Sequence, residues 1–172
     1  MSRPSRSPLV VLALAAGLSS AAPSSAWPKG PPWVSIEIPA NPWDQTTRGA
    51  YLLVHVFHHG LPMQVEPTGT AEGIVNGQRR SVPLSFEKAS RPGVYALRNL
   101  WGGAGRWVLV ITVNQGAHEG AGEDVAQAVV EVSEDGSVSA VRVPTRAERG
   151  QAFPRRVTQA EIDAALRGAK AS

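Results

Sequence analysis

The chain has 172 residues, carries a net charge of +3 and contains no cysteine. Disulfide bonds are therefore excluded, and a chain of this length is long enough to be held together by one hydrophobic core. Of its 17 basic residues, Arg3 and Arg6 lie in a leader, which leaves 15 against 14 acidic residues. This balance argues against nucleic acid as a partner.

Residues 1–26 have the pattern of a signal peptide. Arg3 and Arg6 precede the apolar run 9–18, and the small residues Ser24 and Ala26 suit cleavage near Ala26. Cleavage after Ala22 is the alternative. No later segment is apolar enough to cross a bilayer, so we expect a periplasmic or secreted product without a transmembrane segment.

The mature chain is predicted to be all-β. After a proline-rich lead-in at 27–32, short apolar-alternating runs are separated by turn residues, and Asn76-Gly77 favours a tight hairpin. The expected fold is an immunoglobulin-like antiparallel β-sandwich of 7–8 strands within residues 33–143. The candidate strands are 33–38, 50–58, two within 68–86, 93–100, 105–113, 126–132 and 136–143.

Residues 105–113 are apolar on both faces, which is typical of a central strand. Residues 144–157 have the composition of an exposed linker. A C-terminal helix is predicted over 158–169, because Thr158 and Glu161 have the spacing of a capping box. The face of this helix that carries Ile162, Ala165 and Leu166 is apolar.

A resemblance to a known family covers roughly residues 33–113. The run 92–113 contains a Gly-x-Tyr pair and a Gly-x-Trp pair, and the run 49–63 ends in a Gly-x-Pro turn. These runs resemble the YtkA-like/FixH-like group of exported immunoglobulin-like domains. The resemblance implies the sandwich fold, and some members of the group sit beside metal-transport or respiratory assembly systems. The residues concerned are Gly60, Pro62, Gly93, Tyr95, Gly105 and Trp107.

Three of the four histidines lie within "HVFHHG", residues 55–60. His55 and His59 would share one face of a strand while His58 faces the other way. If the strand ends early, His58 or His59 can turn towards Met63 or His118, and imidazoles with a thioether suit copper. The two interpretations are a metal site and a solvated or hydrogen-bonded cluster, and the second is favoured.

Trp43 and Trp101 both lie in turn-like sequences, where an indole can contact a ligand or seal the core. No Gly-x-Ser-x-Gly elbow or phosphate-binding loop is present, so we expect neither catalysis nor a cofactor. The sequence therefore predicts a non-catalytic binding module whose partner is an unknown protein or envelope component. The alternative is an accessory copper or zinc protein that uses His55, His58, His59 and Met63.

Overall fold

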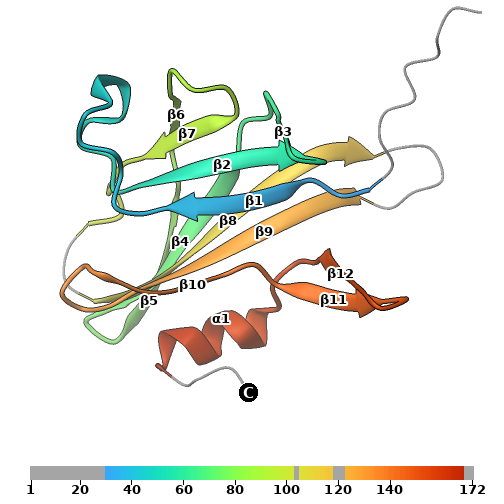
Figure 1. Cartoon of the computed structure of the whole chain (residues 1–172). Helices are drawn as coiled ribbons and strands as arrows, with labels where there is room; N and C mark the ends of the chain where they lie inside the picture. Colours follow the sequence, from blue (N-terminus) through green and yellow to red (C-terminus); the bar gives the residue numbers. More distant parts are fainter. Residues whose placement is uncertain (1–29, 103–104, 118–122, 169–172) are drawn as a thin grey trace, which may run out of the picture.

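A computed structural model describes residues 30–102, 105–117 and 123–168 (Figure 1). The predicted signal peptide, residues 1–26, and His118 lie outside the described residues. Within them the chain folds mainly into strands, with one short helix at the C-terminal end. None of the helices in these ranges has the length and apolar character needed to cross a membrane.

The strands form two facing antiparallel sheets, so the predicted all-β sandwich is confirmed (Figure 1). The first sheet has the order β1-β2-β7-β6, and β3 pairs with β2. Its strands are β1 (Trp33–Glu37), β2 (Leu52–His58), β3 (Leu61–Pro62), β6 (Phe86–Lys88) and β7 (Val94–Leu97). The second has the order β10-β9-β8-β4-β5. Its strands are β4 (Thr68–Val75), β5 (Gln78–Pro83), β8 (Arg106–Ala117), β9 (Glu123–Val132) and β10 (Val138–Arg142).

The hairpin between β4 and β5 forms where the sequence predicts it. Asn76 and Gly77 have φ angles of 51° and 74°, which are the two left-handed positions that a two-residue hairpin turn requires. The hairpin between β9 and β10 turns at Gly136, whose φ is 82°. Local turn chemistry thus fixes how four of the five strands of the second sheet are joined in pairs.

Strand β8 is the central strand that its two apolar faces predict, with β9 on one side and β4 on the other. Trp107, Leu109 and Ile111 belong to the main core between the sheets. Val108 and Val110 lie on the opposite face, in a separate buried cluster. Both faces of β8 are therefore covered, which explains its near-continuous hydrophobic sequence.

Helix α1 (Gln159–Leu166) supplies the cover on the outer face of the second sheet (Figure 1). Ile162, Ala165 and Leu166 pack there with Val108, Val110 and Val129. The capping box is present, because Thr158 accepts from the Glu161 backbone N–H while the Glu161 carboxylate accepts from that of Thr158. The sequence predicted this helix and the side chains that it buries.

The predicted linker 144–157 is largely exposed, yet it has regular structure. It contains a hairpin of β11 (Thr145–Glu148) and β12 (Gln151–Pro154), which pair with each other and with neither large sheet. Arg149 and Gly150 form the turn, with φ angles of 51° and 78°. An arginine is an uncommon residue at a left-handed turn position, so the sequence carries no clear turn signal here.

Candidate binding surface

The most exposed large hydrophobic side chain of the described residues is that of Trp43, which is 87 % exposed. It lies in the connection between β1 and β2, and we call residues 38–50 of this connection the Trp43 loop. The loop contains one short 3-10 turn, η1 (Gln45–Thr47). An indole with this exposure contributes almost no hydrophobic stabilisation to the fold and is available for contact with another molecule.

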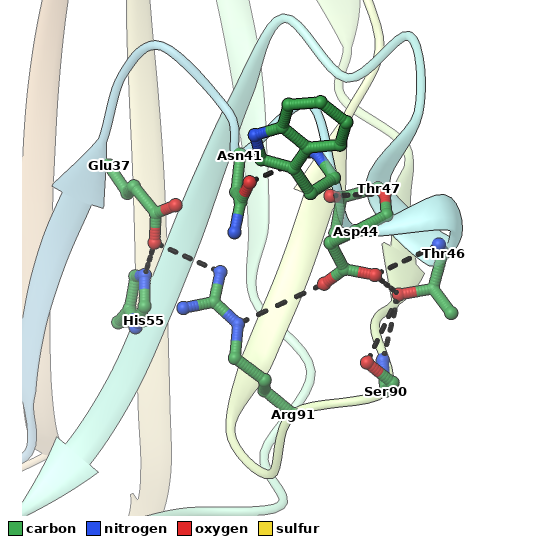
Figure 2. A network of polar contacts seen from close by, with 9 residues as sticks. Glu37, Asn41, Asp44, Thr46, Thr47, His55, Ser90 and Arg91 are labelled. Carbon is green, nitrogen blue, oxygen red and sulfur yellow. Dashed lines mark hydrogen bonds and ion pairs between the residues drawn. The ribbon is translucent and has the colours of Figure 1, made fainter.

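Hydrogen bonds link residues of the Trp43 loop to one another and to Ser90 (Figure 2). The backbone N–H of Trp43 donates to Asn41 Oδ1 at 3.0 Å. Asp44 Oδ1 accepts from the Thr46 backbone N–H at 2.9 Å and from Thr46 Oγ1 at 2.7 Å, which caps η1. The backbone N–H of Ser90, from another part of the chain, donates to Thr46 Oγ1 at 3.1 Å. The exposed indole is therefore carried on an ordered segment.

A charged network joins this loop to the first sheet (Figure 2). Glu37 Oε2 accepts from His55 Nε2 at 2.8 Å and from Arg91 Nη2 at 3.0 Å. Arg91 Nε also lies 4.0 Å from Asp44 Oδ2. Arg91 thus links a carboxylate on β1 to the carboxylate that caps the loop turn.

The same contacts lower the pKa of the Glu37 and Asp44 carboxyl groups. Burial opposes the charge on Glu37, but the hydrogen bonds from His55 and Arg91 outweigh it and hold its pKa below the ordinary value. The pKa of Asp44 is lowered chiefly by its hydrogen bond from the Thr46 side chain. Both carboxylates are therefore kept ionised by groups that also fix the loop.

A small apolar cluster lies on the outer face of the first sheet, beside the network. Leu53, Ala89, Val94 and Ala96 are buried together there. Ala40 and Ala50, one near each end of the Trp43 loop, pack against them. The loop is therefore anchored by packing at both ends as well as by hydrogen bonds.

The structure corrects the interpretation of Trp101 as a contact residue. Its side chain is only 7 % exposed and belongs to the main core. The indole packs edge-to-face on Tyr51, with ring centroids 5.1 Å apart. Tyr51 Oη in turn donates to the Gly136 carbonyl at 2.8 Å. Trp101 therefore seals one end of the sandwich and is unavailable to a ligand.

The structure brings two of the four predicted metal ligands, His58 and His59, together and engages the others elsewhere. His55 is engaged with Glu37, whereas His58 is 6 % exposed and donates from Nε2 to the Gly30 carbonyl at 3.0 Å. His59 follows the end of β2 at a φ of 49°, and its ring contacts that of His58 at 4.1 Å. Met63 packs against the main core. Across residues 30–102, 105–117 and 123–168, no three His, Asp or Glu side chains cluster as metal ligands. Metal binding remains an untested prediction.

Sequence reasoning missed the roles of Glu37, Arg91 and Asp44. One signal was present, because Glu37 and His55 fall on the same face of two neighbouring predicted strands. The register pairs Ser35 with His55 and Glu37 with Leu53, so Glu37 lies diagonally across from His55. Arg91 and Asp44 lie in two different loops. Strand periodicity does not predict that these loops come close to each other.

The chain matches no family model, no curated protein and no solved structure, so its resemblance to YtkA-like/FixH-like domains stays a prediction. The Trp43 loop presents an exposed indole, and the carboxylates near it are engaged in internal contacts. Such an arrangement suits binding through the indole.

Proposed function

We propose that this protein is an exported, non-catalytic binding module of the cell envelope, and that the Trp43 loop is its contact surface. The observation that carries the proposal is the 87 % exposure of Trp43 on a loop fixed by hydrogen bonds. Its partner is a protein or another envelope component.

The proposal rests on the energetics of binding. Tryptophan is among the residues that dominate binding energies, and a rigid loop loses little conformational entropy when it associates. Ordering the loop in the free protein, through Asp44, Thr46 and Arg91, therefore favours affinity for a partner. Export is supported by the leader pattern of residues 1–26 and by the resemblance to exported immunoglobulin-like domains.

The test compares the full-length protein with its Trp43→Ala variant as immobilised baits for periplasmic extract. The Leu100→Ala variant is a matched control, because Leu100 is another exposed large side chain, at 66 %. We expect Trp43→Ala to lose a retained component that wild type and Leu100→Ala both hold. Equal retention by all three proteins would remove the Trp43 loop as the contact surface.

The comparison is valid only if the Trp43→Ala variant folds as the wild type does. Because Trp43 is almost fully exposed, its replacement by alanine should alter the free energy of unfolding by no more than about 0.5 kcal/mol. Trp101→Ala would be an unsuitable partner in the test, since removing a buried indole costs about 3–5 kcal/mol and would confound binding with unfolding.

A further inference from the structure

A groove of about 480 Å³ lies away from the Trp43 loop, where three distant segments of the chain meet. They are residues 30–33 at the start of β1, residues 57–60 at the end of β2, and residues 151–153 of β12. The β11–β12 hairpin, which pairs with neither large sheet, therefore forms one wall of a groove whose other walls belong to the first sheet and the lead-in.

Three aromatic rings line the groove, and the Arg146 guanidinium lies 5.8 Å from the centroid of one of them, Phe153. Trp33 and Phe57 are direct cross-strand neighbours, and Phe153 comes from β12; all three rings are partly buried. The described residues that line the groove include no carboxylate, lysine or arginine. Charge complementarity therefore favours an uncharged ligand that packs flat apolar groups against rings.

One wall of the groove is formed by the end of the proline-rich lead-in. Gly30 and Pro31 lie in its wall, and the Gly30 carbonyl accepts a hydrogen bond from His58 Nε2 at 3.0 Å. Aromatic packing together with a donor to a backbone carbonyl is the chemistry by which grooves recognise polyproline II segments, whose carbonyls are not used in internal hydrogen bonds.

The imidazole of His59 lies beside that of His58 and can also donate a hydrogen bond. His59 is exposed and packs edge-to-face on His58, with ring centroids 4.1 Å apart. Its φ of 49° is a conformation that glycine adopts with less strain, so a histidine here carries a cost that the fold does not require. His59 lines the groove, and its exposed imidazole can donate a hydrogen bond.

From these observations we propose that the groove binds a proline-rich segment of a partner protein in the polyproline II conformation. The pyrrolidine rings would pack on Trp33, Phe57 and Phe153, and His59 would donate to a ligand carbonyl as His58 donates to that of Gly30. The groove and the Trp43 loop share no residues. The proposal for the groove can therefore fail while the proposed contact surface at Trp43 stands, and the reverse.

The experiment titrates the isotopically labelled full-length protein with decaproline and follows backbone amide resonances, while fluorescence anisotropy gives the affinity. We expect shifts concentrated in residues 30–33, 57–60 and 151–153. His59→Gly should weaken binding about fivefold, the loss of one hydrogen bond, and the positive φ of this position accommodates a glycine. The control Leu61→Ala, an exposed residue outside the lining, should leave the affinity within about twofold of wild type.

Three results would overturn the proposal. The first is the absence of shifts in the groove, the second an unchanged affinity in His59→Gly, and the third equal binding of a glycine–serine peptide of the same length. A neutral oligosaccharide is included as a rival ligand; if it shifts these residues and decaproline does not, the groove is a sugar site and the assignment is wrong.

Discussion

The side-chain carbonyl of Gln127 accepts a hydrogen bond from the backbone N–H of Val157 at 2.7 Å. The amide nitrogen of the same side chain donates to Thr112 Oγ1 at 2.9 Å. Gln127 is buried on the outer face of the second sheet, and Val157 immediately precedes the N-cap of α1. This one buried amide therefore fastens the start of the helix to β8 and β9.

We predict that Gln127→Leu destabilises the protein by about 1–3 kcal/mol, because it leaves the Val157 N–H and the Thr112 hydroxyl without these partners. Urea unfolding followed by circular dichroism gives the free energy. Gln64→Leu, at an exposed position, controls for the change of residue type and should cost less than about 0.5 kcal/mol. Equal stability of the two variants would show that the buried amide contributes nothing.

A second prediction concerns Gly73, which lies directly across from Trp107 in the β4–β8 register. A Cβ atom on Gly73 would come within 2.6 Å of Cδ2 of the Trp107 indole, which has almost no space to move because it is 2 % exposed. Gly73→Ala should therefore cost about 1–3 kcal/mol through overpacking.

The control for Gly73 is a double-mutant cycle. In a Trp107→Leu background the smaller side chain leaves room for the methyl group, so Gly73→Ala should cost much less there. A cost that is the same in both backgrounds would mean that backbone preference, and not contact with the indole, accounts for the loss.

Local signals in the sequence predicted much of the fold. Alternation located eight strands of the two large sheets but missed the short strands β3 and β6. Asn76-Gly77 specified a hairpin, and the Thr158–Glu161 spacing specified the helix start. Each of these features depends on residues close together in the chain, and the same pattern also determined which face is buried.

The candidate site was harder to predict, as the two loop tryptophans show. "NPWDQ" and "NLWGG" have similar turn-like compositions, yet Trp43 is exposed and Trp101 is buried. The difference arises because Tyr51 lies beneath one indole and not the other, a tertiary contact between distant parts of the chain. The contact between Arg91 and Asp44 has the same origin.

The acid sensitivity of the C-terminal region should depend on Glu161. Its carboxylate accepts from Arg155 at 2.7 and 2.9 Å and also from Thr158. The Arg155 guanidinium is the largest cause that holds the Glu161 pKa far below its ordinary value of 4.5. A pKa lowered by folding means that the stabilisation is complete above about pH 5 and is lost as the pH falls towards the folded-state pKa.

We therefore predict that Glu161→Gln loses about 1 kcal/mol of stability at pH 7 and less at pH 3. The value is modest because the two side chains are 33 % and 29 % exposed, so water screens their attraction. Urea unfolding at both pH values checks it, with the exposed Glu134→Gln as a control for the loss of one negative charge. If the stability loss of Glu161→Gln is as large at pH 3 as at pH 7, the Glu161 carboxylate is not the source of the stabilisation.

The last prediction separates the rigidity of the Trp43 loop from the presence of its indole. Arg91 contacts Glu37 at 3.0 Å and Asp44 at 4.0 Å, and its side chain is 43 % exposed. Arg91→Met should change global stability by no more than about 1 kcal/mol, since exposed ion pairs contribute little. It should nevertheless loosen the loop, because Asp44 loses its link to the first sheet.

Hydrogen exchange measures that loosening at one defined group, the Thr46 backbone N–H that donates to Asp44 Oδ1. We expect its exchange to quicken about fivefold in Arg91→Met, which corresponds to roughly 1 kcal/mol of local protection. Arg80→Met, an exposed arginine on β5, should leave it unchanged. If capture of the envelope component falls in Arg91→Met while Trp43 is intact, the order of the loop contributes to binding. Slower capture with unchanged exchange would instead make Arg91 itself a contact residue.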